Sequence, residues 1–302
     1  MNKSSFLLAL IVIGGAGFAA GYFVSNRSPQ PADAGASNPA EATREFAELV
    51  RKNKGPFKDP LEKLRIEQKL EAARASLVKG GPEEFLRIVA ALGDRDRSDA
   101  PGTVGGGGSN IGEPDAEVRE ALITVLPEID PARAAPYLAE RLLDTNEQGR
   151  VRASAAGLLA HLDRKVAIPA LTKSLDAASK RSWAGARAVV DALVFIGGDD
   201  AGDAMLKALM RSTTDLTLRI ALTESVGTLH YAPAWDALEN LVRFEESDHY
   251  VRRAAMRSLL QIDPPRALAL ARDQIPVEKD PPFQEFLRDV ERTQSVVPAK
   301  PR

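Results

Sequence analysis

Apolar residues recur along the central part of the chain at a helical spacing, and the helix they mark is itself repeated. Val118, Leu122, Leu126 and Ile129 stand at i, i+4, i+8 and i+11, which places them on one stripe of an α-helix. The residue that ends this stripe has counterparts at steps of 33 or 34 residues, namely Ile129, Leu162, Ile196, Leu229 and Ile262. So constant a period is typical of a repeat array of helices, and no part of the pattern favours strands.

Residues that start and stop helices recur with the same period. Three residues before each first helix stand Asp115, Gln148, Ser182, Asp215 and Asp248. All but the glutamine are side chains that accept hydrogen bonds from the unpaired amides at a helix start. A short polar turn such as Asp130-Pro131 follows each first helix, and we expect Pro136 and Pro169 to open the second helix in two of the copies.

A single hairpin of this kind exposes apolar faces on both sides and cannot offset its own ordering entropy. Stacking the copies buries those faces, and each buried Leu or Val contributes about 1.5–3 kcal/mol. The pattern therefore predicts five stacked, antiparallel helical pairs over residues 117–272.

The repeated segments resemble a known family. VRASA at residues 151–155, followed by IPAL at 168–171 and repeated as VRRAA at 251–255, resembles HEAT repeats of the short bacterial, phycobilisome-lyase type. The resemblance covers about half of the chain, and it implies an all-α fold: a right-handed solenoid of HEAT-like hairpins, or armadillo-type superhelix, of the kind that serves as a generic scaffold. Residues 185–186, Gly-Ala, depart from the Val-Arg start of the other copies.

The N-terminal part of the chain has the pattern of a membrane helix. Residues 6–24, from Phe6 to Val24, carry no charge and would span about 28 Å as a helix, close to the hydrocarbon thickness of a bilayer. Lys3 precedes the run, so we expect a single-pass inner-membrane protein whose C-terminal bulk lies outside the cytoplasm, in the periplasm. The alternative is a cleaved signal peptide with a small-x-small site at residues 17–19, which would leave a secreted or periplasmic soluble protein.

Gly17 and Gly21 form a GxxxG pair within this run. Such a pair lets two membrane helices approach closely, which would support a homodimer. The other interpretation is that glycine is simply common in membrane helices.

Composition and helix signals divide the chain into six segments. They are a transmembrane signal anchor at 1–24, a flexible tether with a short helix at 25–57, a degenerate N-terminal capping hairpin at 58–92, a Gly-rich loop at 93–114, the repeat array with a C-terminal cap helix at 115–293, and a disordered tail at 294–302.

The sequence offers no motif for catalysis or for a cofactor. The chain has no cysteine, which excludes thiol catalysis and Cys-type zinc sites, and its three histidines stand in different copies. The glycine run at 105–108 lacks the Gly-Lys-Ser/Thr of a phosphate loop, and Asp199, Asp200 and Asp203 fall where helix caps are expected. A formal net charge of −2 argues against a nucleic-acid partner. We therefore expect no catalytic, cofactor or metal residues and no enzyme.

One set of charged residues does repeat with the array: Arg119, Arg152, Arg219 and Arg252. We favour a structural role, in which each guanidinium bonds carbonyls or acidic caps in the neighbouring turn, for instance near Asp115, Asp215 and Asp248. The alternative is a stripe that binds an acidic partner.

These observations indicate a membrane-anchored, non-enzymatic scaffold or adaptor that binds a protein partner on the surface of the solenoid. The alternatives are an accessory factor that assists or modifies an enzyme, as the lyase-type resemblance implies, and a secreted soluble binding protein. The sequence does not specify which face of the solenoid binds.

Overall fold

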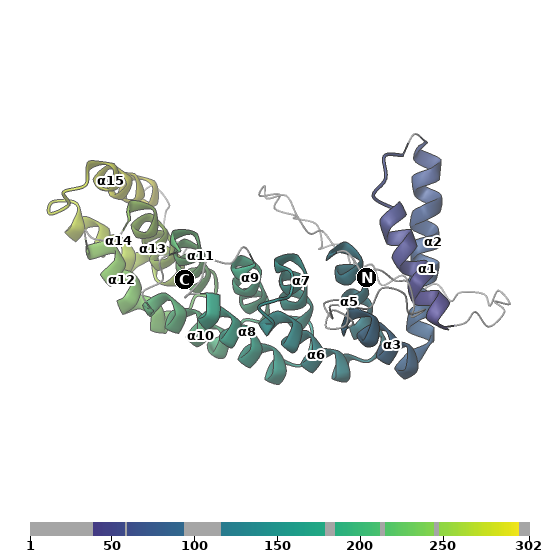
Figure 1. The fold of residues 1–302 in the computed structure, drawn as a ribbon. Coiled ribbons are helices and arrows are strands. Elements are labelled where there is room, and N and C mark those ends of the chain that lie inside the picture. The colour runs from purple at the N-terminus through teal and green to yellow at the C-terminus, as the bar shows by residue number, and fades with distance from the viewer. Residues whose placement is uncertain are drawn as a thin grey trace, which may run out of the picture. The chain divides into compact units, whose positions relative to one another are not determined.

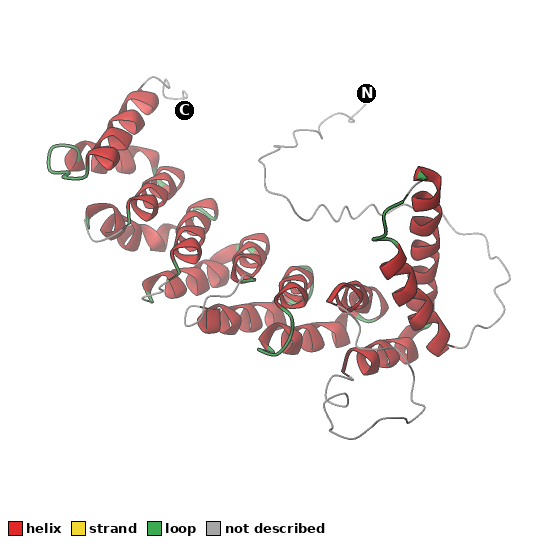
Figure 2. Cartoon of the chain, turned by 45° about the horizontal axis from the view of Figure 1, so that its top comes forward, coloured by secondary structure: helices red, strands yellow, loops and turns green. Residues whose placement is uncertain are grey.

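The computed structural model describes residues 39–57, 59–93, 116–178, 185–211, 215–244 and 248–295 (Figure 1). The chain divides into two units, Met1–Ser37 and Asn38–Arg302, and every described residue belongs to the second. All regular elements among these residues are helices, as Figure 2 shows, so the prediction of an all-α fold is confirmed for this part of the chain. The predicted anchor, with Gly17 and Gly21, the tether up to residue 38 and most of the glycine-rich loop lie outside the described residues, as do residues 296–302 of the predicted tail.

Two kinds of helix alternate along the array. The first helices are α5 (Ala116–Ile129), α7 (Gly149–Leu159), α9 (Ala186–Ile196), α11 (Leu216–Thr228) and α13 (His249–Ile262). The second helices are α6 (Pro131–Leu143), α8 (Arg164–Ala178), α10 (Gly198–Met210), α12 (Trp235–Arg243), which follows the 3-10 turn Ala232–Ala234, and α14 (Pro264–Gln274). Each first helix contacts the next first helix, so the predicted helical pairs stack in chain order.

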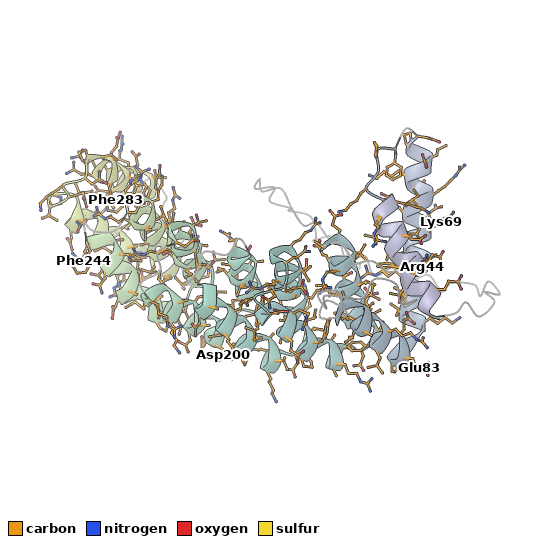
Figure 3. The ribbon with its side chains drawn as sticks, viewed as in Figure 1. Arg44, Lys69, Glu83, Asp200, Phe244 and Phe283 are labelled. Carbon is orange, nitrogen blue, oxygen red and sulfur yellow. The ribbon has the colours of Figure 1, made fainter. Side chains whose placement is uncertain are left out.

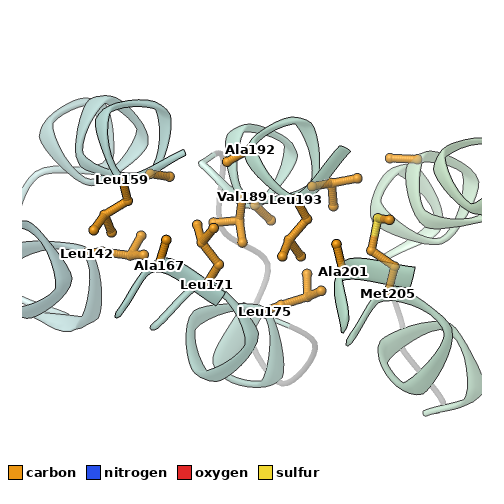
Figure 4. Packing of buried hydrophobic residues seen from close by; sticks show 14 of the residues in the cluster. Leu142, Leu159, Ala167, Leu171, Leu175, Val189, Ala192, Leu193, Ala201 and Met205 are labelled. Atoms are coloured by element: carbon orange, nitrogen blue, oxygen red, sulfur yellow. The ribbon is translucent and has the colours of Figure 1, made fainter. Parts of the chain in front are cut away.

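The core of the array repeats with the period of the sequence. The residue three positions before the end of each apolar stripe is fully buried in every copy: Leu126, Leu159, Leu193, Val226 and Leu259. Figure 4 shows Leu159 and Leu193 facing the buried side chains of second helices, among them Ala167, Leu171 and Leu175. The period of the apolar residues in the sequence therefore identifies the residues at the interface between first and second helices.

Helix starts follow the predicted caps at two of the described positions. Asp215 accepts a hydrogen bond from the amide of Leu218 at 3.0 Å, and Asp248 accepts one from the amide of Tyr250 at 2.8 Å. Asp115 and Ser182 lie outside the described residues.

The prediction that Pro136 and Pro169 open second helices is wrong. Both prolines lie inside their helices, because α6 begins at Pro131 and α8 begins at Arg164. The cap of α6 is Asp130, whose side chain accepts from the amide of Arg133, and Asp163 accepts from the amide of Lys165 at the start of α8. A capped start outweighs a proline in the second turn, which removes one backbone hydrogen bond.

Among the described residues, three helices precede the array and one follows it. Helix α1 (Pro39–Lys52) packs on α2 (Pro60–Lys79), and α3 (Gly81–Gly93) packs on α5. Gly81 joins α2 to α3 with φ +63°, a conformation that favours glycine. At the other end α15 (Pro281–Ser295) buries Phe283, Leu287 and Val290 against α13 and α14. None of the described helices is both long enough and apolar enough to cross a membrane.

Candidate functional site

The four repeated arginines occupy one position in the fold, the fourth residue of α5, α7, α11 and α13. At three of these positions the guanidinium donates to a backbone carbonyl near the end of the helix that precedes it, which is a second helix or, before α5, helix α3. The pairs are Arg119 with Leu92, Arg152 with Leu142 and Arg252 with Val242, and the shortest distance in each is 2.8–2.9 Å. The last carbonyls of a helix have no partner within the helix, so these arginines satisfy them.

Arg119 also forms a buried ion pair. Its Nε and Nη2 donate to the two carboxylate oxygens of Glu147 at 3.2 and 2.5 Å. Both side chains are almost completely buried, and Glu147 also accepts from the amide of Gln148. A two-point contact of this kind fixes the orientation of both groups and joins the start of α5 to the turn before α7.

Arg252 forms the equivalent contact at the C-terminal end of the array. It donates Nη1 to Glu278 Oε1 at 3.0 Å and Nη2 to Oε2, while its guanidinium carbon lies 3.9 Å from the centre of the Phe283 ring. Burial alone would raise the pKa of Glu278, but hydrogen bonds from Arg252, from the amide of Asp280 and from Gln274 lower that pKa below its ordinary value. Glu278 is therefore held as a carboxylate.

Arg152 is buried too, and burial lowers the pKa of its guanidinium. The negative charges of Asp144 and Glu147 oppose that shift and favour the charged form. Sequence reasoning had placed the acidic partners of the arginines near Asp115, Asp215 and Asp248. The carboxylates that contact Arg119 and Arg252 are instead Glu147 and Glu278, which stand 28 and 26 residues after their arginines.

Arg219 differs from the other three. It is only half-buried, and its side chain forms no hydrogen bond or ion pair with any residue that the structure describes. It lines a hollow of about 350 Å³ between the ends of α10 and α12, which we call the Arg219 hollow. The other described lining residues are Leu209, Met210, Ala237, Asn240, Leu241 and Phe244.

The hollow has a local structural cause. Among the second helices α6 and α8 pack together, as do α8 and α10, whereas α10 and α12 form no comparable contact. Tyr231 lies against Gly202 near the start of α10, where an added Cβ would come within 2.5 Å of the ring, and its hydroxyl donates to Asp203. The ring thus fills the space at the N-terminal ends of α10 and α12, and the hollow lies at their C-terminal ends.

Exposed apolar side chains border the hollow. Met210 is 66% exposed and Phe244, which Figure 3 labels just past the end of α12, is 60% exposed. Large apolar side chains gathered around a hollow on a protein surface are typical of interaction sites.

The remaining candidates for chemistry are used within the fold. Asp200 pairs with Arg164, and Asp203 accepts from Tyr231, whose pKa is raised to about 12 by burial and by this hydrogen bond. The ring of His161 packs against that of Phe195 in a tilted arrangement, and His230 bonds the carbonyl of Gln261. Within the described ranges no group of three or more His, Asp or Glu could hold a metal ion.

A second hollow, of about 610 Å³, runs along α15. Its described lining is mostly charged, with both signs present: Pro281, Gln284, Glu285, Arg288, Glu291 and Arg292. Two of these charges are already paired, Glu291 with Arg272 and Arg292 with Asp289, so this surface resembles an ordinary solvated helix face.

Comparison with known proteins gives two findings. The family model described as HEAT repeats matches residues 109–188. Among solved structures the chain is similar to human deoxyhypusine hydroxylase in complex with glycerol, with 17% identity and a TM-score of 0.30 over 84% of this chain and 97% of that one. No curated protein matches the sequence.

The expectation that the chain is not an enzyme is contradicted by this comparison, because a hydroxylase is among the similar structures, and we withdraw it. A TM-score of 0.30 assigns no activity, substrate or cofactor to this chain.

The family match falls on α5 to α8 and on the start of α9, and the helical pairs continue with the same period to α14. The matched segment and the all-helical fold of the described residues together support a HEAT-repeat protein.

Proposed function

We propose that this protein is a scaffold or adaptor that binds a protein partner at the Arg219 hollow. HEAT repeats commonly serve as protein-interaction scaffolds, because stacked pairs present long surfaces whose side chains can vary without loss of the fold. The observation that carries the proposal is the apolar border of the hollow, formed by Met210 and Phe244 at the ends of adjacent second helices.

A protein partner fits this surface better than a nucleic acid does. The formal net charge of the chain is −2, and Arg219 is the only charged side chain among the described residues that line the hollow. Nucleic-acid sites instead require many cations to neutralise phosphates.

The proposal includes the place of the protein in the cell. Residues 6–24 would anchor it in the inner membrane as one helix, with the repeats, arranged as a right-handed solenoid, in the periplasm. Pairing through Gly17 and Gly21 would make the anchor a dimer. The likeness to lyase-type repeats also remains a prediction.

Site-specific photo-crosslinking in cells tests the scaffold proposal. A photoreactive amino acid replaces Phe244 in the full chain, and in a matched control it replaces Phe195, which is 62% exposed at the end of α9. We expect a discrete adduct from position 244 that is absent from position 195 and is lost when Met210→Glu places a charge in the apolar border. No adduct at position 244, or the same adducts from both positions, would contradict the proposal.

A further inference from the structure

We infer that the Arg219 hollow binds an acidic peptide segment, one in which a carboxylate side chain stands next to an apolar one. This inference rests on the proposed function and specifies the chemistry of the partner. Three observations on the described residues carry it: the donors of Arg219 that none of them uses, the charges on the lining of the hollow, and its apolar walls.

Donor use is the first observation. A guanidinium has five N–H donors and accepts nothing. Arg252 uses its donors on Val242 and Glu278, and Arg119 uses its donors on Leu92 and Glu147. Arg219 stands at the same position of its helix, but its side chain bonds none of the described residues, although Leu209 of the preceding second helix lines the same hollow. With respect to the described residues, the N–H donors of its guanidinium are therefore unused, and their planar arrangement matches a two-oxygen acceptor such as a carboxylate.

Charge is the second observation. Eight residues before Arg152 stands Asp144, whose negative charge acts on that guanidinium. Eight residues before Arg219 the chain has Arg211 instead, and the carboxylate that Arg211 pairs with comes from Asp176 of α8. No acidic side chain lines the hollow among the described residues. The one charge among the described lining residues is therefore that of Arg219, which is complementary to an acidic ligand.

The walls are the third observation. Leu209, Leu241 and Phe244 line the hollow together with Arg219, so a bound segment would exclude water and strengthen the ion pair. Asn240 is exposed and can donate its amide to a peptide carbonyl. An apolar side chain next to the carboxylate would cover Met210 and Phe244. Neither a purely acidic segment nor a purely apolar one uses all of these groups.

The test is selection of peptides from a phage-displayed random nonapeptide library on the full chain in detergent micelles. We expect enriched peptides to combine Asp or Glu with a neighbouring apolar residue. Arg219→Gln should weaken the best peptide about 10- to 100-fold, the range for a hydrogen bond to a charged group, and replacing its acid by the amide should do the same. Arg288→Gln removes the same charge from the hollow along α15 and should leave affinity unchanged. Enrichment that does not distinguish wild type from Arg219→Gln overturns the inference.

Thermal unfolding separates a binding role from a structural one. Arg219→Gln should leave the unfolding midpoint unchanged. Glu245 and Glu246 lie outside the described residues; Glu245 follows Arg219 by 26 residues, the same spacing as Glu278 after Arg252, and Glu246 follows it by 27. If the double variant Glu245→Gln, Glu246→Gln and the variant Arg219→Gln each lowered the unfolding midpoint, Arg219 would form an ion pair that stabilises the fold. The inference would then be wrong. Adducts from position 244 without a preference for acidic peptides would preserve the proposed function while refuting this inference.

Discussion

Replacing Glu278 by glutamine should markedly destabilise the C-terminal end of the array. The substitution keeps the shape of the side chain and removes its charge. Arg252, whose side chain is 2% exposed, is then left as a buried cation without a counter-charge. Hydrogen bonds that Glu278 accepts from Gln274 at 3.1 Å and from the amide of Asp280 at 2.9 Å also weaken, because an amide has one acceptor oxygen in place of two.

The size of the loss in unfolding free energy follows from the contacts that Arg252 keeps. Breaking a buried ion pair by removing one partner costs about 3–5 kcal/mol. Arg252 keeps its bond to the carbonyl of Val242 and its contact with the Phe283 ring, and cation–π contacts are worth about 0.5–2 kcal/mol. We therefore expect a loss near the lower end, about 3 kcal/mol, which lowers the melting temperature by about 6–12 °C for a unit of this size.

Urea denaturation followed by circular dichroism, with hydrogen exchange to locate the loss, is the appropriate assay. Protection of backbone amides from hydrogen exchange should fall first in α14 and α15, because each helical pair in a repeat array depends on its neighbours for stability. Glu285→Gln makes the same chemical change on an exposed residue of α15 and should have almost no effect.

The pH dependence provides a second check. The pKa of Glu278 in the fold is below its ordinary value of 4.5, so the carboxylate stabilises the folded state above that pH. This contribution is lost as the pH falls through the lowered folded-state pKa. The difference in the free energy of unfolding between wild type and Glu278→Gln should thus have its full value at pH 7 and shrink at pH values below about 4.5. A Glu278→Gln variant as stable as wild type at pH 7 would refute the reasoning.

Three further outcomes are expected. Leu159→Ala should cost about 2–5 kcal/mol, because Leu159 is fully buried between the layers, and an unchanged denaturation curve would disprove the register. Gly227→Ala should destabilise by about 1–3 kcal/mol, since its Cβ would come within 2.6 Å of the Cα of Ser258, whereas Gly157→Ala on α7, where nothing lies within 4 Å, should stabilise by up to about 1 kcal/mol. A reporter active only in the periplasm, fused after Arg302, should be active in a chain that stays with membranes in carbonate washes; a mature chain without its N-terminus would instead favour the secreted form.

The repeat itself could be predicted from the sequence because burial acts on every copy alike. A buried apolar residue returns each time a pair is added, so Leu126, Leu159 and Leu259 identify the core without any structure. Helix starts were less predictable. Pro136 and Pro169 suit a first turn, yet the chain places them in the second turn because Asp130 and Asp163 cap the helices earlier. Local signals compete, and the stronger cap determines the start.

The candidate site was only half predictable. Equal spacing revealed the four arginines but could not reveal that their environments differ. Glu147 and Glu278 lie in turns 26–28 residues later, and the recurrence of that spacing is the signal that could have identified them. The hollow beside Arg219 and the contact of the Tyr231 ring with Gly202 both arise between separate helices, and no periodicity of the sequence contains them.

The central claim is that one arginine of the repeated set binds a partner while the others hold the fold together. The most direct measurement compares unfolding midpoints and affinity for the selected acidic peptide across Arg119→Gln, Arg152→Gln, Arg219→Gln and Arg252→Gln in the full chain. We predict that the variants at 119, 152 and 252 unfold earlier, whereas the variant at 219 keeps the wild-type midpoint and loses peptide binding. A variant at 219 that unfolds as early as the others, or that binds the peptide as wild type does, would contradict the claim.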